Sequence, residues 1–141
     1  MSEWNNKIID EFRSKGGVGI PNFGDRLLLL TTRGAKTGRS HTTPLAYTRD
    51  GDKYLVIASM GGAPRHPAWY HNIVANREAE IEVGRDRFHV RATPLPDGPE
   101  HDRLYAAQAA IMPGFAEYQR KTTRIIPVVL LERVNEARQA A

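Results

Sequence analysis

Thr31-Thr32-Arg33-Gly34-Ala35-Lys36-Thr37-Gly38-Arg39 is a basic, glycine-containing stretch between two apolar runs of the chain, residues 27–30 and 44–47. No acidic residue occurs between Arg26 and Arg49. Glycines let backbone N–H groups converge on one point, and cations neutralise negative charge, so such a loop can bind an anion. The alternative is a solvated, positively charged hairpin turn, and the loop by itself does not separate these two interpretations.

The apolar runs on either side of this basic loop (residues 32–39) predict two β-strands, at residues 26–32 and 42–49. The first strand is so rich in leucine that we expect it to be buried on both faces. Asp50-Gly51-Asp52 is a hairpin signal, and a third strand is predicted at residues 54–59.

Outside this region, helices and strands are both expected. The apolar residues of segment 4–12 have helical spacing, and Gly16-Gly17 ends that helix. Pro67 suits the first turn of a second helix, which should end near Asn76. The remaining predictions are a hairpin at 79–83 and 87–93, a linker at 94–99, helices at 100–112 and 115–121, and a last strand at 125–134 in which Pro127 indicates an edge or a bulge.

These elements predict one domain over residues 1–141, of the α+β fold class. Strands joined mostly by hairpins, with few helices, favour an antiparallel β-barrel with helices packed outside it. The helix within residues 1–17 is a candidate for a mobile segment, and residues 135–141 are expected to form a frayed tail. Three roles stay open for that helix: packing on its own barrel, covering the active site, or peripheral contact with a membrane.

The composition excludes several classes of protein. The 141 residues contain no cysteine, which removes disulfides, thiolate metal sites and cysteine nucleophiles. The formal net charge of +4 favours an anionic partner. Because the cations concentrate around the basic loop, a localised anion site is favoured over a nucleic-acid surface. The absence of an apolar signal segment and of a run of roughly 18 apolar residues predicts a cytoplasmic protein.

No familiar catalytic or metal-binding motif is present. The chain lacks G-x-S-x-G, H-E-x-x-H, Walker and G-x-G-x-x-G patterns. His66 and His71 are five residues apart, which is a poor spacing for two metal ligands on one helix. We therefore expect no metal site.

A different kind of site is indicated where the third predicted strand ends. Ser59 closes that strand, Gly61-Gly62 follows, and the next helix carries Trp69 and Tyr70. A hydroxyl beside a glycine turn and an aromatic helix can form the wall of a flat ligand. The alternative is a capping serine next to aromatic residues that belong only to the core.

Taken together, these segments resemble the deazaflavin-dependent nitroreductase family, the coenzyme F420-dependent reductases of actinobacteria. Residues 31–38 are similar to the family's T-T-x-G-x-K-T-G segment. Residues 58–62 (Ala-Ser-Met-Gly-Gly) and 67–72 (Pro-Ala-Trp-Tyr-His-Asn) are similar to A-S-x-G-G and P-x-W-Y-x-N. Pro44-Leu45 and Arg49-Asp50-Gly51 follow at the expected offsets, and the likeness continues more loosely through residues 112–115 and 124–128.

The resemblance implies a split β-barrel, related to flavin-binding barrels, that binds a deazaflavin with a phosphate and a polyglutamate tail. Lys36, Thr37 and the backbone near Ala35 and Gly38 would hold the phosphate and the tail. The ring would lie against residues of two strands and one helix: His41, Thr42, Thr43, Pro44, Leu45, Ala46, Val56, Ile57, Ala58, Ser59, Met60, Ala68, Trp69, Tyr70, His71 and Asn72.

Because a reduced deazaflavin supplies the hydride itself, the protein need only bind, orient and exclude water. Ser59 is the candidate catalytic residue, since its hydroxyl can stabilise negative charge on a substrate carbonyl. Met112, Phe115 and Tyr118 are the candidate substrate residues. Two of them lack the hydroxyls of the tyrosine-rich, nitroimidazole-activating members. Flat quinones, enones or unsaturated lactones are therefore expected as substrates ahead of nitroaromatic compounds.

Other interpretations remain from the sequence. His41 and Met60 stand where several members have arginine and lysine, which removes two charges from tail binding. A flavin-mononucleotide-dependent barrel oxidoreductase and a non-catalytic deazaflavin-binding protein are the alternatives to a reductase. Relatives of this fold pair readily, so either a monomer or a weak homodimer is expected.

Overall fold

The computed structural model describes residues 3–20 and 23–134, without the side chains of residues 3 and 4. The predicted frayed tail, 135–141, lies outside the described residues. Four α-helices, one short 3-10 helix and seven strands are described: α1 (Glu3–Lys15), β1 (Leu27–Arg33), β2 (Ser40–Ala46), β3 (Thr48–Asp50), β4 (Lys53–Ile57), η1 (Met60–Gly62), α2 (Ala68–Ala75), β5 (Glu78–Val83), β6 (Asp86–Leu95), α3 (Pro99–Ile111), α4 (Gly114–Arg120) and β7 (Val128–Arg133).

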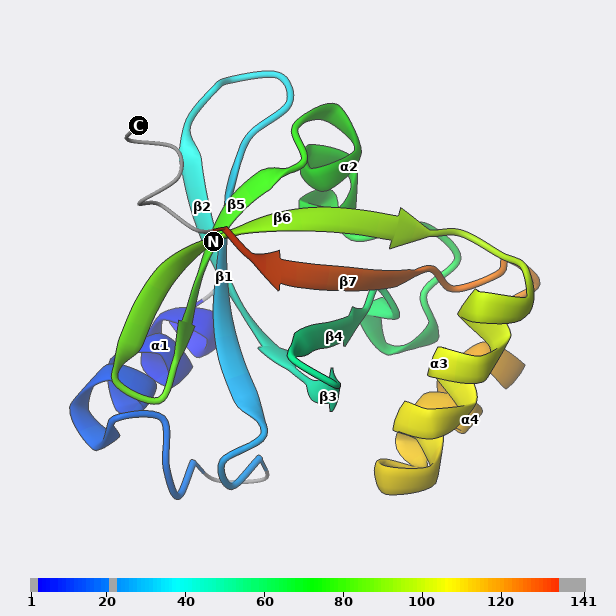
Figure 1. Ribbon diagram of the computed structural model, residues 1–141, viewed down its shortest axis with the longest axis horizontal. Helices are drawn as coiled ribbons and strands as arrows, with labels where there is room; N and C mark the ends of the chain where they lie inside the picture. The colour runs from blue at the N-terminus through cyan, green and yellow to red at the C-terminus, as the bar shows by residue number, and fades with distance from the viewer. Residues whose placement is uncertain (1–2, 21–22, 135–141) are drawn as a thin grey trace.

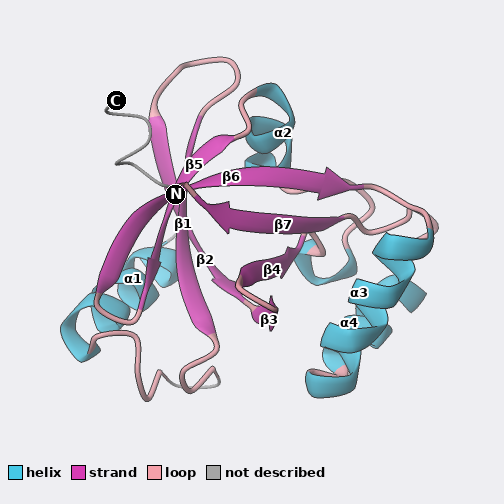
Figure 2. Ribbon diagram, in the orientation of Figure 1, coloured by secondary structure: helices cyan, strands magenta, loops and turns pink. Residues whose placement is uncertain are grey.

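The strands form one antiparallel sheet in the order β2-β1-β5-β6-β7-β4-β3. β2 and β3 are consecutive in the chain and separated only by Tyr47, yet they lie at opposite ends of this order. One continuous segment thus supplies both ends, which requires the sheet to curl round on itself. The helices lie around the curled sheet (Figures 1 and 2). This architecture confirms the predicted split β-barrel with helices outside it.

The structure corrects the prediction of a single strand at 42–49. The first part of that segment pairs with β1 and the second part with β4. Between them, the Tyr47 N–H leaves the ladder and donates to the Arg26 carbonyl at 2.9 Å. The strand is interrupted there because its two halves belong to different ends of the sheet.

The prediction that Pro127 marks an edge or a bulge within a strand at 125–134 is also wrong, because Pro127 lies just before the strand. β7 begins directly after Pro127 and pairs with β6 on one side and β4 on the other. The Pro127 carbonyl accepts a hydrogen bond from the Ala58 N–H at 3.0 Å. Because Pro127 precedes the ladder, its missing N–H removes no strand hydrogen bond. β6 also continues to Leu95, into the segment that was predicted as a linker.

β1 is buried on both faces, as its leucines predict. Leu28 and Leu30 belong to the main core cluster inside the barrel. Leu27 and Leu29 point the other way and pack with apolar residues of α1. The apolar face of α1 (Ile8, Ile9 and Phe12) is therefore buried against its own barrel. None of the described helices is both long and apolar enough to cross a membrane.

β4 separates the two larger core clusters by simple alternation along the strand. Val56, with Ala58 just beyond the strand, faces the main cluster, while Leu55 and Ile57 face α3 and α4. α3 and α4 lie together beside the C-terminal end of β4 (Figure 1). This arrangement leaves the end of β4 between the barrel and the helix pair.

Candidate active site

A pocket of about 740 Å³ lies where β2, the end of β4, the start of α2 and the α3–α4 junction meet. Twelve of the residues predicted for the cofactor or the substrate line it: Thr43, Pro44, Leu45, Ala46, Ile57, Ser59, Met60, Ala68, Trp69, Met112, Phe115 and Tyr118. The structure adds six lining residues that were not among the predicted contacts, although Gly61 and Pro67 belong to the quoted motifs: Asn5, Phe23, Gly61, Pro67, Pro113 and Gly114. Segments that are far apart in the sequence, from Asn5 to Tyr118, thus form one mostly apolar cavity.

The other predicted ring contacts lie outside this lining. The side chains of Val56, Ala58 and Tyr70 are buried in the main core cluster. Burial raises the pKa of the Tyr70 hydroxyl. His41 and His71 are exposed. Any contact of Val56 or Ala58 with a ligand would have to come from their backbone.

A turn with unusual backbone angles forms one wall of the pocket. In this strand-end turn (residues 59–62), the φ angles of Met60, Gly61 and Gly62 are 48°, 65° and 84°. Two of the three are glycines, which adopt positive φ at little cost, whereas Met60 does not. Within the described part of the chain, the Ser59 hydroxyl has no hydrogen-bonding partner, although Ser59 is buried and lines the pocket. It is therefore available to a bound molecule.

The basic loop is ordered by its own backbone and by α2. The Gly34 N–H donates to the Arg39 carbonyl at 2.7 Å, and the Gly38 N–H donates to the Gly34 carbonyl at 2.9 Å. The side chains of Arg33, Lys36 and Arg39 are exposed. Among the described residues, no carboxylate forms an ion pair with any of these three cations. The loop thus presents uncompensated positive charge.

Asn72 ties the basic loop to α2. Its Oδ1 accepts a hydrogen bond from the Ala35 N–H at 3.0 Å, and its Nδ2 donates to the Thr32 hydroxyl at 3.1 Å. Asn72 is buried, and these two bonds satisfy both its carbonyl oxygen and its amide nitrogen. The structure places Asn72 behind the loop, where it fixes the loop's position.

α2 connects the pocket to the basic loop. Ala68 and Trp69 line the pocket, and Asn72, one helical turn later, holds the loop. One turn of an α-helix rises about 5.4 Å, so the apolar pocket and the cationic loop are neighbours. Figure 1 shows the loop between β1 and β2 standing beside α2.

Replacing Asn72 with leucine should lower the free energy of unfolding by about 1–3 kcal/mol, because the Ala35 N–H and the Thr32 hydroxyl lose their buried partner. Asn72→Asp keeps an acceptor for both groups and should cost less. Urea unfolding of the two variants measures this difference. Equal loss of stability in both would mean that the hydrogen bonds to Asn72 are not what holds the loop.

His66 lies beside α2 and accepts a hydrogen bond at Nδ1 from Arg124 at 2.9 Å. Burial, followed by the nearby charges of Arg124 and His71, lowers the pKa of the His66 imidazole. A lowered folded-state pKa means that the unfolded chain binds the proton more readily. The stabilisation that neutral His66 provides is thus complete above the unfolded pKa and is lost as the pH falls.

We therefore expect the wild-type protein to lose stability relative to His66→Asn as the pH falls below about 6.5, the pKa of an unperturbed histidine. Asparagine keeps an acceptor for Arg124 but does not titrate. Urea unfolding of both proteins between pH 5 and 8 gives the comparison. A stability difference that stays constant across this range would contradict the prediction.

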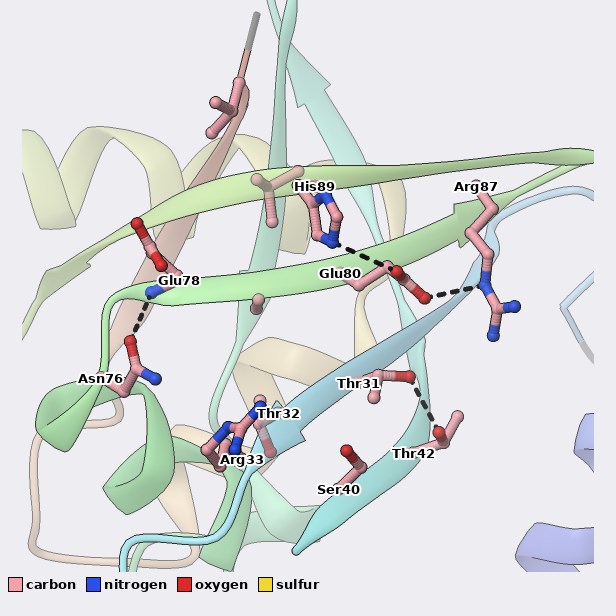
Figure 3. A pocket seen from close by; sticks show the side chains of 13 residues that line it. Thr31, Thr32, Arg33, Ser40, Thr42, Asn76, Glu78, Glu80, Arg87 and His89 are labelled. Atoms are coloured by element: carbon pink, nitrogen blue, oxygen red, sulfur yellow. Dashed lines mark hydrogen bonds and ion pairs between the residues drawn. The ribbon is translucent and has the colours of Figure 1, made fainter. Parts of the chain in front are cut away.

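A second pocket, of about 620 Å³, lies over β1, β2, β5 and β6 (Figure 3). Thr42, predicted as a ring contact, lines this second pocket and not the first. Its hydroxyl is hydrogen-bonded to that of Thr31 at 2.8 Å. Glu80 is paired with Arg87 at 2.7 Å and approaches His89 at 3.4 Å. Two carboxylates, Glu78 and Glu80, line this second pocket, and Glu80 neutralises Arg87. The second pocket is therefore a poorer anion site than the basic loop.

Known proteins resemble this chain over most of its length. The sequence profile of the F420H(2)-dependent quinone reductase family matches residues 5–133. An F420H(2)-dependent quinone reductase of Mycobacterium tuberculosis (strain ATCC 25618 / H37Rv) is 50% identical over an alignment of 124 residues, and the match covers 85% of this chain and 83% of that protein.

Two solved structures have similar folds. One, an F420-H2 dependent reductase called FDR-A, is 37% identical, with a TM-score of 0.69, and the match covers 76% of this chain and 94% of that one. The other, described as a domain-swapped dimer, is 34% identical, with a TM-score of 0.71, and covers 90% and 93%. With the profile match across both the pocket and the basic loop, this similarity shows that the chain belongs to the F420H(2)-dependent quinone reductase family.

Proposed function

We propose that this protein transfers a hydride from reduced coenzyme F420 to a quinone. The observation that carries the proposal is the contact, through α2, between an apolar pocket and a loop of three unpaired cations. A deazaflavin has a flat ring at one end and an anionic tail at the other. Pockets for such ligands are mostly apolar and of this size, with a few polar groups that fix orientation. The residues present therefore fit the cofactor.

Separate parts of the site would hold the two ends of the cofactor. Lys36, Thr37 and the backbone of the basic loop would bind the phosphate and the tail. The ring would lie in the pocket between β2 and Trp69. When bound, the reduced deazaflavin supplies the hydride; the chain's own task is to orient both reactants and to exclude water.

Ser59 is the residue that we assign to the reaction itself. Its hydroxyl is unpaired among the described residues and Ser59 lines the pocket, so we assign to this hydroxyl the hydrogen bond to the carbonyl oxygen on which negative charge develops. No other hydroxyl group from β4 or the strand-end turn lines the pocket among the described residues. Ser59 thus acts by hydrogen bonding and leaves the hydride transfer to the cofactor.

The helix side of the pocket favours flat, apolar acceptors. Met112 and Phe115 present apolar surface, and Tyr118 provides the phenol of this side. The Phe115 and Tyr118 rings meet edge to face, with centroids 5.4 Å apart. A quinone, enone or unsaturated lactone can stack here, whereas a bicyclic nitroimidazole would find few hydrogen-bond donors. The assembly that we expect is a monomer or a weak homodimer.

Turnover of menadione with reduced F420, followed by cofactor absorbance, tests the proposal. Oxidation of the cofactor only in the presence of enzyme and quinone supports it. Binding without turnover would favour a cofactor carrier, and activity with reduced flavin mononucleotide alone would favour a flavin enzyme. Faster reduction of a bicyclic nitroimidazole than of any quinone, enone or lactone would show that the roles given to Met112 and Phe115 are wrong.

A further inference from the structure

The Arg124 side chain reaches from the segment before β7 to both sides of the strand-end turn. Nη2 donates to the Ser59 carbonyl at 2.8 Å, and Nη1 and Nη2 both lie 3.3 Å from the Ala58 carbonyl. Nε donates to the Ala63 carbonyl at 2.8 Å, beyond the turn. Nη1 also donates to Nδ1 of His66. One planar guanidinium thus joins the residues before the turn to those after it.

The strand-end turn needs such a support. Three successive positive φ values put Met60 in a conformation that a residue with a side chain rarely adopts. Two backbone hydrogen bonds cross the turn, from the Gly62 N–H to the Ser59 carbonyl and from the Ala63 N–H to the Met60 carbonyl. Ser59, Met60 and Gly61 line the pocket, so any relaxation of the turn alters its wall.

Arg124 is itself held in place. The side-chain amide of Gln119 donates to the Arg124 carbonyl at 2.7 Å and accepts from the Ile126 N–H at 3.0 Å. Among the described residues, no carboxylate forms an ion pair with Arg124, and burial lowers the pKa of its guanidinium. Its donors are therefore directed at neutral acceptors, and its charge strengthens each of those hydrogen bonds.

The far side of the turn is closed by α4. A Cβ on Gly62 would lie 2.8 Å from the Tyr118 carbonyl, so the turn touches the backbone of the helix that carries Tyr118. Arg124 and α4 thus confine the turn between them. The guanidinium provides hydrogen bonds, and the helix provides steric contact.

We propose that Arg124 is a positioning residue, which clamps the strand-end turn through the carbonyls of Ser59 and Ala63 and thereby places the Ser59 hydroxyl for catalysis. The clamp follows from geometry alone, while its catalytic consequence rests on the proposed quinone reductase function. Lysine cannot replace it, because a single ammonium lacks the fork that reaches separate acceptors in one plane.

Amide hydrogen exchange of the cofactor-free protein tests the clamp directly. In Arg124→Lys, peptides covering residues 58–63 should exchange about tenfold faster or more, which corresponds to one lost charge-assisted hydrogen bond. Peptides of the β5–β6 hairpin should not change. Arg103→Lys, which alters an exposed arginine on α3 paired with Glu100, is the matched control and should leave residues 58–63 unchanged. If Arg124→Lys fails to fold, Gln119→Ala gives the same measurement, since it releases the segment that carries Arg124.

Kinetics with reduced F420 and menadione test the consequence. In Arg124→Lys, we expect kcat to fall about tenfold to a hundredfold, the effect of a small misplacement of a catalytic group. Cofactor affinity should stay within about threefold of wild type, because the basic loop is held by Asn72. The kinetic isotope effect with deuterated reduced cofactor should rise as hydride transfer becomes slower.

The outcomes separate the clamp from the function. Unchanged exchange at residues 58–63 would overturn the clamp. Wild-type kcat in a variant whose exchange is faster would overturn the role of the clamp in placing the Ser59 hydroxyl. An inactive wild-type protein would overturn the quinone reductase function, and the exchange experiment would still decide whether Arg124 holds the turn.

Discussion

Trp69→Ala should lower the free energy of unfolding by about 3–5 kcal/mol, the usual cost of removing a large buried aromatic residue. Trp69 is 6% exposed and belongs to the main core cluster inside the barrel. Its ring also contacts Tyr70 edge to face, with centroids 6.4 Å apart. Urea unfolding measures the change, with Trp69→Phe as the control that keeps most of the apolar volume. A loss below about 1 kcal/mol in Trp69→Ala would show that the site collapses around the smaller residue.

Trp69 also lines the pocket, so the core and the ligand wall share this residue. We expect its fluorescence to be quenched when the deazaflavin binds. The measurement needs a Trp4→Phe background, because Trp4 is the other tryptophan of the chain and its emission would mask the change at Trp69. Unchanged emission at saturating cofactor would place the ring elsewhere.

Lys36→Ala should raise the dissociation constant for F420 about tenfold to a hundredfold, because a charge-assisted hydrogen bond of about 1.5–3 kcal/mol is lost. The loss should shrink at high salt, since Lys36 is exposed. Titration of the cofactor at two ionic strengths measures both effects. Arg85→Ala, at the β5–β6 turn, is the control for removing a cation away from the loop. Wild-type affinity in folded Lys36→Ala would remove the main support for placing the anionic tail of the cofactor at the basic loop.

Much of the fold was predictable because local patterns and tertiary structure agree. The leucines of β1, the glycine turn at Gly84 and the proline before α2 each specify one conformation in their own neighbourhood. The break at Tyr47 was not predictable in this way. Its cause is the closure of the sheet, and no residue at 42–49 signals that the two halves pair with different strands. The prediction for Pro127 failed for a related reason. Whether a proline lies inside a strand or just before it depends on where the strand begins, and the pairing of β7 with β4 and β6 decides that.

The sequence predicted the separate segments of the site better than the contacts that hold these segments together. The pocket residues at 43–46 and the basic loop come from contiguous motifs. Strand geometry predicts that alternate side chains of β4 point to opposite faces. Which face is the barrel interior, and hence that Val56 and Ala58 are buried there, is known only from the structure. The roles of Asn72 and Arg124 depend on partners 37 to 66 residues away in sequence. Asn72 stands out as a polar residue on a helix with apolar neighbours, and Arg124 only as a cation just before an apolar run. Neither signal reveals the partner.

The closure of the sheet through Tyr47 links cofactor binding to folding. The pocket takes one wall from β2 and another from the end of β4, two strands far apart in the sheet order that face each other only when the barrel is closed. A ligand that binds across this seam stabilises the closed form alone, by about 2.7 kcal/mol at a hundred times its dissociation constant. Saturating F420 should therefore slow any proteolysis of the purified protein that proceeds through the opened barrel.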